Sequence, residues 1–353
     1  MTDAHSSRPL EPFSLPLEAP LSTAAGAIEE RAGYLVRYDH RGETGVGEAT
    51  PLPGWTESLD DCERALERAL EAGTGGQHSN GLLELDADEA PAARHGFATA
   101  LLDADARADG VPLYRWFDDA RAVHRVPVNA TLGDADLTST VQRAEAAVER
   151  GFDCLKCKVG ARTVDEDVSR VEAVREAVGE GVTLRLDANG GWTRAEAERV
   201  IERVAEYDVR YVEQPVPAAD LEGLADLRGS EVDVAIDEGL CDHSMADVFE
   251  ADAADVVILK PMVLGGPGNA HTLAMRARDR GIEPVVTTTV DAVVARTAAV
   301  HVAAAIPDVS ACGLATADRL AEDLAPDPAP VSDGSIAVPQ APGLGVEIPG
   351  DPR

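Results

Sequence analysis

Only three lysines occur in the chain, and all three stand in short runs of apolar residues. Lys156 and Lys158 lie in Asp153-Cys-Leu-Lys-Cys-Lys-Val159, and Lys260 lies in Val256-Val-Ile-Leu-Lys-Pro261. The other 28 of the 31 basic residues are arginine, whose guanidinium stays protonated at any working pH. The lysines are therefore candidates for acid–base chemistry. The alternative is that drift against surface lysine left three survivors at random.

Carboxylates recur at regular intervals between these lysines. Asp187 stands in Asp-Ala-Asn, Glu213 in Glu-Gln-Pro and Asp237 in Asp-Glu, with spacings of 26 and 24 residues. Three carboxylates held close together need a cation, and oxygen ligands without histidine or thiolate select a hard ion. Mg²⁺ is the first choice and Mn²⁺ the second. A single acidic residue at a strand end is more often a helix cap or a surface charge. The prediction therefore depends on these carboxylates and lysines occurring together at successive strand ends.

Eight apolar or β-branched runs from about residue 125 onward supply the elements that position these groups. Amphipathic segments of helical period separate the runs, and Thr193-Arg-Ala-Glu196 has the spacing of a capping box. Units of about 25 residues favour a closed parallel barrel over an open sheet, which normally carries a glycine-rich phosphate turn. The predicted strands are Val126–Leu132, Phe152–Val159, Val182–Asp187, Val209–Gln214, Val232–Asp237, Asp255–Lys260, Glu283–Thr289 and Val309–Leu314.

The carboxyl ends of all strands in such a barrel meet at one rim, where its functional groups gather. The lysines and carboxylates should therefore share one mouth. Lys156 and Lys158 are two apart on a strand and both point inward, whereas Cys157 points outward. Neighbouring lysines and a divalent cation disfavour the charged form of a lysine, which makes one of them a usable base.

The two ends of the chain have a different pattern. Strands at Tyr34–Tyr38 and Gly45–Ala49, helices near Leu59–Ala72 and Glu89–Ala108, and a strand at Ser335–Val338 indicate an α+β unit. We predict a capping domain from residues 1–122 and 328–353 beside a barrel from residues 123–327. The loops Leu21–Ala27 and Thr50–Trp55 either reach over the barrel mouth as a lid or are ordinary surface connections.

Composition excludes several classes of function. Of 353 residues 64 are acidic, and the formal net charge is −33. Such a surface with scarce lysine indicates a halophilic protein of a high-salt cytoplasm, because salt screens the self-repulsion. It argues against nucleic-acid binding, which needs basic patches.

No targeting region or membrane span is predicted, because the longest apolar stretch, Ala292 to Ile306, contains Arg296 and His301. We therefore expect a cytoplasmic protein, and a homo-oligomer stays possible. The five cysteines do not suggest disulfides, since Cys154 and Cys157 would face opposite sides of a strand.

The motifs Lys-x-Lys, Asp-x-Asn, Glu-Gln-Pro, Asp-Glu and Lys-Pro, at five successive strand ends, resemble those of the enolase superfamily, in particular its muconate-lactonising-enzyme subgroup. The resemblance extends over nearly the whole chain, including the tail Pro342-Gly-Leu-Gly-Val-Glu347. It implies an α/β fold, with an α+β capping domain and a modified (β/α)₇β TIM barrel. It also implies an enzyme in which Mg²⁺ holds a small-molecule carboxylate and makes the neighbouring proton removable.

The resemblance assigns roles to the residues of the rim. Mg²⁺ would be held by Asp187, Glu213 and Asp237, supported by Asn189 and Glu238. Lys158 would take the proton, and Lys156 would bias its pKa and stabilise the enediolate. Lys260, on the opposite face, would either act as a second acid–base group in a racemisation or hold positive charge over the intermediate.

Within the subgroup the chain most resembles the o-succinylbenzoate synthases of menaquinone biosynthesis. These lyases dehydrate their substrate by removing a proton alpha to a metal-bound carboxylate, after which water is lost. The resemblance rests on four segments, which are Arg185-Leu-Asp-Ala-Asn189, Lys260-Pro-Met-Val-Leu-Gly265, Thr287-Thr-Thr289 and Leu52-Pro-Gly-Trp-Thr-Glu57.

Three groups are candidates for substrate contact, Arg185, Thr287 and Thr288. Arg185 shares the parity of Asp187 and either faces a substrate carboxylate or pairs with a neighbouring acid. Asp291 stands after the hydroxyl run where a glutamate is expected, which leaves the contacts there open.

Other functions stay open at this point. An N-succinylamino-acid racemase, or another epimerase of the subgroup, would use the same residues. Dipeptide epimerases carry Asp-x-Asp at the eighth strand, where this chain has Gly313-Leu-Ala-Thr316, which argues against that function. A non-catalytic barrel that binds a carboxylate is a further alternative, which the intact lysines and carboxylates disfavour.

Overall fold

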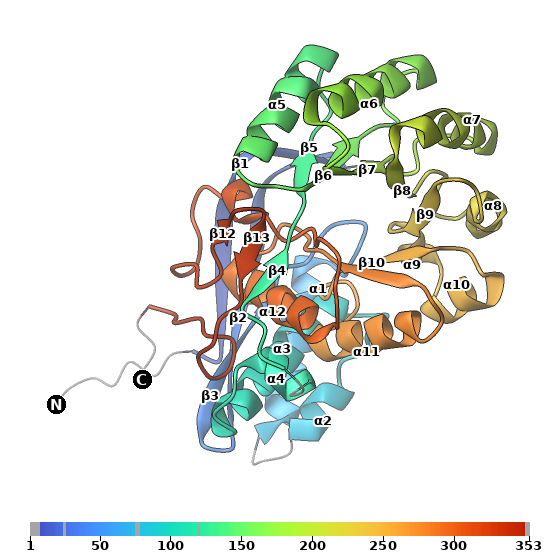
Figure 1. Ribbon diagram of the computed structural model, residues 1–353. Helices are drawn as coiled ribbons and strands as arrows, with labels where there is room; N and C mark the ends of the chain where they lie inside the picture. The colour runs from blue at the N-terminus through green and yellow to red at the C-terminus, as the bar shows by residue number, and fades with distance from the viewer. Residues whose placement is uncertain (1–7, 24–25, 75–77, 119–120, 350–353) are drawn as a thin grey trace.

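The computed structural model describes residues 8–23, 26–74, 78–118 and 121–349, whose strands form three sheets (Figure 1). The amino-terminal sheet is antiparallel, in the order β1-β2-β3, and its central strand β2 packs apolar residues on both faces. Tyr34, Val36 and Tyr38 pack on one side with helix residues such as Phe97, and Leu35 and Val46 pack on the other. Its elements are β1 (Leu10–Thr23), β2 (Gly26–His40), β3 (Glu43–Ala49), α1 (Leu59–Ala72), α2 (His78–Leu83), α3 (Pro91–Ala108) and α4 (Leu113–Phe117).

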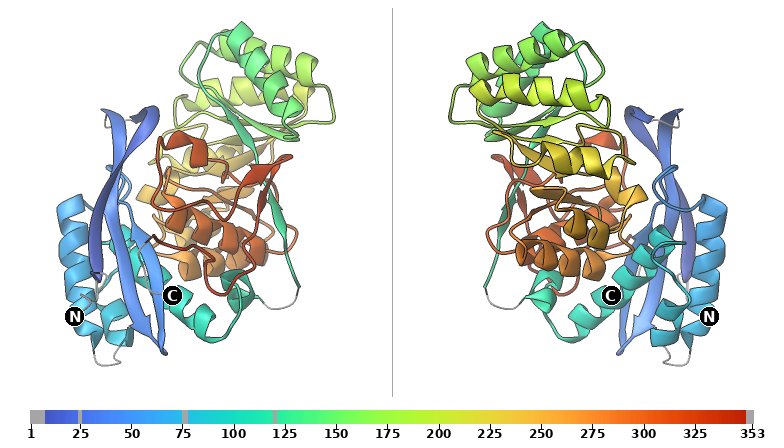
Figure 2. Two further views of the ribbon diagram at one scale, coloured as in Figure 1. Left: turned by 90° about the vertical axis from the view of Figure 1, so that its left-hand side faces the viewer. Right: turned by 90° about the vertical axis from the view of Figure 1, so that its right-hand side faces the viewer.

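These elements confirm the predicted strands and helices of the amino-terminal part, but β1, α2 and α4 were not predicted. The predicted loop Leu21–Ala27 is the end of the β1–β2 hairpin, and its residues 24 and 25 lie outside the described part of the chain. Figure 2 shows the three strands standing as a layer beside the barrel, with α1 on the far side.

A seven-stranded parallel sheet, in the order β11-β10-β9-β8-β7-β6-β5, curls into the predicted TIM-like barrel. Helices follow the strands and cover the outside of the sheet (Figure 1). The strands are β5 (Ala130–Leu132), β6 (Cys154–Lys158), β7 (Thr183–Asp187), β8 (Val209–Glu213), β9 (Asp233–Ile236), β10 (Val256–Leu259) and β11 (Glu283–Val286). The helices are α5 (Leu137–Glu149), α6 (Val164–Val178), α7 (Arg194–Val204), α8 (Leu221–Leu227), α9 (Gly239–Asp242), α10 (Met245–Ala251), α11 (Pro267–Arg278) and α12 (Val293–Ala305).

The eighth predicted strand, Val309–Leu314, is reduced to single bridges. Cys312 pairs with Val128, and Gly313 pairs with Thr287, so this segment joins the two edges of the sheet. The first predicted strand is divided into β4 (Arg125–Pro127) and β5, because β4 pairs instead with the carboxyl-terminal hairpin of β12 (Val331–Ser332) and β13 (Ser335–Ala337).

The carboxyl-terminal tail contacts both parts of the molecule. β13 pairs with β4 near the start of the barrel, whereas Leu344 and Val346 pack against Leu35 of the capping sheet. The domain boundaries given above stay a prediction.

The core is divided by the barrel sheet. Outward-facing residues, Cys157 among them, pack under the helices in one large apolar cluster, whereas Tyr211, Ile258 and Val285 belong to a separate cluster formed by inward-facing strand residues. Thr193 forms the predicted capping box with Glu196, and Thr163 forms another with Glu166 at the start of α6.

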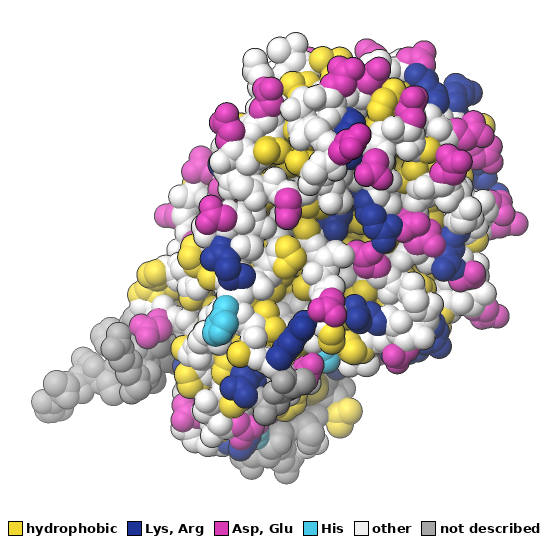
Figure 3. Space-filling view, viewed as in Figure 1, with side chains coloured by type: hydrophobic (Ala, Val, Ile, Leu, Met, Phe, Trp, Pro, Cys, Tyr) yellow, Lys and Arg dark blue, Asp and Glu magenta, His cyan; other side chains and the backbone are white. Residues whose placement is uncertain are grey.

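Asp and Glu side chains are scattered over the face shown in Figure 3, among fewer Arg and Lys. Within the described residues, no helix has the length and apolar character needed to cross a bilayer.

A buried polar seam joins the capping sheet to the barrel. The Glu48 carboxylate, on β3, accepts hydrogen bonds from the backbone N–H groups of Ala292 at 2.9 Å and Ala295 at 2.8 Å, at the start of α12. Arg31, on β2, donates to the carbonyl of Val290 at 3.2 Å. Val290 has a φ of 61°, which is strained for a β-branched residue. The capping domain therefore holds the segment that follows β11 in its conformation.

Glu48 is expected to make stability depend on pH. Burial, and then Asp291, raises the pKa of Glu48 from 4.5 to about 7. The unfolded chain therefore loses this proton first, so the contribution of Glu48 to stability is present below pH 4.5 and declines up to about pH 7. The decline in the native protein is on the order of 3 kcal/mol, and Glu48→Gln, which does not ionise, should lack it. Urea unfolding between pH 4.5 and 8 measures this. The free energy of unfolding of Glu48→Gln should rise relative to that of the native protein as the pH rises, whereas an unchanged difference between the two would contradict the assignment.

Candidate active site

The predicted lysines and carboxylates meet at the carboxyl ends of the barrel strands. The register pairs Lys158 with Asp187, and Asp187 with Glu213, across three adjacent strands. Asp237 directly follows β9, and Lys260 directly follows β10. The barrel therefore brings these five groups, together with Lys156, to one rim.

Lys156 lies between two carboxylates. Its Nζ is 2.8 Å from Oε1 of Glu213 and 2.9 Å from Oδ2 of Asp187. Burial acts to lower the pKa of Lys156, but Asp187 and then Glu213 outweigh it and hold this pKa well above its ordinary value. Lys156 is therefore suited to hold positive charge at the rim and not to give up a proton.

Lys158 stands one step further out on the same strand. Its Nζ donates to Oδ2 of Asp187 at 2.6 Å and to Oδ1 of Asn189 at 2.7 Å. Its side chain is 32% exposed, against 15% for Lys156. Of the two lysines of β6, Lys158 is the one that a ligand at the mouth can reach.

The two carboxylates beside these lysines have different proton affinities. For Asp187, burial acts to raise the pKa, but Lys156 and Lys158 outweigh it and hold this pKa below its ordinary value. Burial, and then the charge of Asp187, raises the pKa of Glu213 to about 8. Oε2 of Glu213 is buried without a hydrogen-bond partner. Glu213 is therefore the carboxylate of the cluster that most needs a further positive charge.

The loops after β7 and β8 have unusual backbone conformations that fix the outer groups. Asn189, with a φ of 46°, donates from Nδ2 to Oε1 of Glu238 at 2.8 Å. Gln214, with a φ of 40°, accepts from the backbone N–H groups of Asp237 at 3.0 Å and Gly239 at 2.9 Å. Asn189 and Glu238 therefore lie beside the cluster, and their support of a bound cation stays a prediction. Gln214 was noted only as part of a motif, and its role in holding Asp237 was not.

Lys260 lies against the third carboxylate. Its Nζ is 2.6 and 2.7 Å from the two oxygens of Asp237, and it stands 3.5 Å from the ring centroid of Trp55. Trp55 comes from the predicted loop Thr50–Trp55, so this segment of the capping domain does reach the barrel mouth. A cation over an indole face is stabilised by the ring quadrupole.

The donor set at the rim fits a hard divalent cation. As the side chains stand, no group of three or more His, Cys, Asp or Glu among the described residues is arranged to hold a metal ion. However, Asp187, Glu213 and Asp237 offer oxygen ligands from three adjacent strands, and one oxygen of Glu213 is buried and unpaired.

The structure does not place Arg185 at the mouth, where a substrate contact was predicted. Arg185 pairs in register with Lys156, is 2% exposed, and lies inside the barrel with its guanidinium 4.9 Å from the Tyr211 ring centroid. Its NH1 donates to the main-chain carbonyl of Ala311 at 2.5 Å. Contact of Arg185 with a substrate carboxylate stays a prediction. Parity gave its inward direction correctly, but it could not show how deep the side chain lies.

The threonines after β11 hydrogen-bond within the protein. Oγ1 of Thr287 donates to the carbonyl of Gly313 at 2.9 Å, and the hydroxyls of Thr288 and Thr316 are 3.0 Å apart. Thr287 is half-buried and Thr288 is buried. The predicted contacts of Thr287 and Thr288 with substrate stay a prediction.

Comparisons with known proteins give the family and the fold that this chain resembles. A family model described as "Enolase C-terminal domain-like" matches residues 139–351, and one described as "MenC, N-terminal domain" matches residues 8–104. An o-succinylbenzoate synthase of Thermosynechococcus vestitus is 31% identical over 303 residues, which cover 82% of this chain and 86% of the relative.

Two solved structures have the same fold over nearly their whole length. An N-succinyl Arg/Lys racemase from Bacillus cereus matches with a TM-score of 0.85 and 28% identity, covering 96% of this chain and 94% of that one. A dipeptide epimerase from Enterococcus faecalis, complexed with Mg and the dipeptide L-Leu-L-Tyr, matches with a TM-score of 0.83 and 28% identity, covering 96% and 98%.

Proposed function

Because the chain belongs to the enolase superfamily, in its muconate-lactonising-enzyme subgroup, we propose that it is a Mg²⁺-dependent lyase of the o-succinylbenzoate synthase type. Proton removal beside a carboxylate is supported by the pair of lysine positions at the rim, and the choice of the synthase is supported by the MenC amino-terminal match and by the likeness to the synthase of Thermosynechococcus vestitus. Lys158 engages Asp187 on one side of the cluster, and Lys260 engages Asp237 on the other. A planar carboxylate substrate between them would have an amine near each face.

The residues divide the chemistry as follows. Asp187, Glu213 and Asp237 would hold the cation, which supplies positive charge for the substrate carboxylate. Lys158 removes the proton from the carbon next to that carboxylate, and the same proton is then available to the departing hydroxide. Lys156 and Lys260 keep their protons and stabilise the negative charge that develops.

A racemase that acts on N-succinylamino acids is the second candidate. It is favoured by the placement of Lys260 opposite Lys158, because racemisation needs a proton donor on the second face. The likeness to the racemase of Bacillus cereus supports it as well.

One pair of assays tests the proposal. Purified protein in molar KCl with Mg²⁺ is given the succinyl-hydroxycyclohexadiene carboxylate, followed by ultraviolet absorbance, and an N-succinylamino acid, followed by polarimetry. Fast loss of the diene with slow racemisation supports the synthase. Racemisation without dehydration moves the function to the racemase, and activity on neither substrate overturns both assignments.

Lys260→Arg is expected to separate the two functions. Arginine keeps the positive charge but cannot give up a proton. Dehydration should therefore fall by less than about tenfold, whereas racemisation should fall by the 10²-fold or more typical of a lost general acid. Both rates are measured on the same preparation, with Mg²⁺ affinity as the control. Equal loss of the two activities would contradict the assigned role of Lys260.

A further inference from the structure

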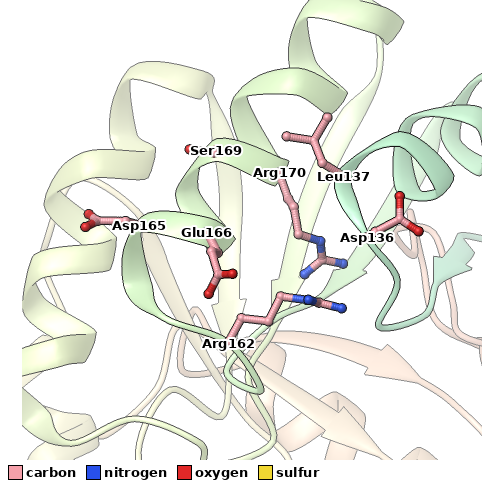
Figure 4. Close-up of a pocket in the computed structure, with 7 residues that line it drawn as sticks. All are labelled: Asp136, Leu137, Arg162, Asp165, Glu166, Ser169 and Arg170. Atoms are coloured by element: carbon pink, nitrogen blue, oxygen red, sulfur yellow. The ribbon is translucent and has the colours of Figure 1, made fainter.

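Helix α6 carries a buried ion pair directly behind the strand end that bears Lys158. Asp167 and Arg170 are 1% and 4% exposed, and NH1 of Arg170 is 3.0 Å from Oδ1 of Asp167. Figure 4 shows Arg170 with Arg162 beside a surface hollow on the outside of the barrel. The cost of desolvating two buried charges offsets their attraction, so a buried ion pair adds little net stability. The other hydrogen bonds of Asp167 and Arg170 indicate what the pair does.

Both members of the pair hold the backbone that follows β6. NH1 of Arg170 donates to the carbonyl of Lys158 at 3.0 Å. β5 ends at Leu132, which pairs with Cys157, so the ladder on that side ends one residue before Lys158. Oδ2 of Asp167 accepts from the N–H of Gly160 at 2.8 Å. The ion pair therefore holds the main chain on both sides of Val159.

The backbone at Gly160 is tightly constrained by its conformation and by its neighbours. Gly160 has a φ of +87°, and a Cβ at this position would lie 2.7 Å from the carbonyl oxygen of Ala188. Asn189 follows Ala188 and accepts the hydrogen bond from Nζ of Lys158. A shift at Gly160 would therefore move the loop that orients the lysine, as well as the lysine itself.

Arg170 is itself held from a second helix. Its Nε and NH2 are 3.4 and 3.3 Å from Oγ1 of Thr140 on α5. The guanidinium thus connects α5, α6 and the end of β6, and all of these contacts face the protein interior.

We propose that the Asp167–Arg170 pair is a positioning device for Lys158. It acts through the main chain at Lys158 and Gly160 and holds the Lys158 ammonium between Asp187 and Asn189. This inference rests on the proposed function only in taking Lys158 as the base. Neither Asp167 nor Arg170 touches the reacting atoms.

A matched control lies on the same helix. Arg175 is also a buried arginine with several main-chain partners, but these are at the opposite end of the barrel, at the carbonyls of Tyr207, Gly179, Val182 and Asp208. Arg170→Met and Arg175→Met should both lower the unfolding midpoint. Only Arg170→Met should lower kcat, by about tenfold or more at unchanged KM, since misplacement of a reacting group by about 1 Å can cost 10²-fold.

Arg170→Lys provides a milder change. The lysine ammonium can donate a hydrogen bond to the Lys158 carbonyl or to Asp167, but it lacks the forked guanidinium N–H groups that also reach Thr140. It should recover part of kcat. If Arg170→Met keeps the native kcat, or if both methionine variants lose kcat equally, the positioning role is overturned.

A second readout does not need substrate. Reductive methylation with ¹³C-formaldehyde labels the three lysines, and Lys158→Arg identifies the resonance of Lys158. Arg170→Met and Arg170→Lys should shift that resonance more than those of Lys156 and Lys260, and Arg175→Met should leave it in place. An unmoved Lys158 resonance overturns the inference even if the native protein is inactive on both substrates, an outcome that would count only against the proposed function.

Discussion

Lys158→Ala is expected to lower turnover by at least about 10²-fold, because it removes the group that takes the proton. The loss should be in kcat and not in KM, since the carboxylates that would hold the cation, and through the cation the substrate, are unchanged. The measurement is steady-state turnover of the diene and of the N-succinylamino acid. Exchange of the substrate alpha proton with deuterated solvent should disappear as well.

Two controls make this result specific to proton removal. Mg²⁺ affinity and the unfolding midpoint of Lys158→Ala should stay close to those of the native protein, because Asp187 keeps Lys156 as a partner at 2.9 Å. Lys156→Ala is the comparison, since it leaves two buried carboxylates without their shared cation and should therefore weaken folding also. Normal turnover in Lys158→Ala would remove this residue from its proposed role.

The rim could be predicted from the sequence because parallel strands of a barrel end on one side. Once Lys156, Asp187 and Glu213 were assigned to neighbouring strand ends, their convergence followed from the barrel alone. The register confirms it, with Lys158 opposite Asp187 and Asp187 opposite Glu213.

The depth of a side chain within the barrel could not be predicted in this way. Arg185 has the same parity as Asp187, but it lies one layer lower and is closed off by Ala311 and Tyr211. Parity fixes the direction of a side chain, whereas its access to solvent depends on what the other strands place above it.

Two strands were missed or shortened for reasons of local chemistry. β1 contains Pro12 and Pro16, which argue against a central strand, but β1 is an edge strand and tolerates them. The segment around Cys312 closes the barrel through single bridges, so it lacks the regular ladder that its apolar pattern suggested.

Contacts between the capping domain and the barrel were beyond the sequence pattern. Glu48 caps α12 from a distance of more than two hundred residues along the chain, and Trp55 stacks on Lys260 from a loop whose approach was left open. Such contacts depend on how two separately patterned units dock, which neither periodicity nor spacing records.

Asp187→Asn should cause the other large loss, because Asp187 is expected to bind the cation and also accepts from Lys156 and Lys158. The amide keeps the size of the side chain but lacks its charge, so Mg²⁺ affinity and turnover should fall together. Asn189→Ala is the matched comparison, since Asn189 touches Lys158 and Glu238 without being an expected ligand. A change at a supporting residue of this kind typically costs 10- to 100-fold, and Asp187→Asn should exceed it. Calorimetric titration with Mg²⁺ beside steady-state turnover tests both variants. If Asp187→Asn bound Mg²⁺ as tightly as Asn189→Ala does, the cation would have to be held elsewhere on the rim, and the three-carboxylate assignment would fail.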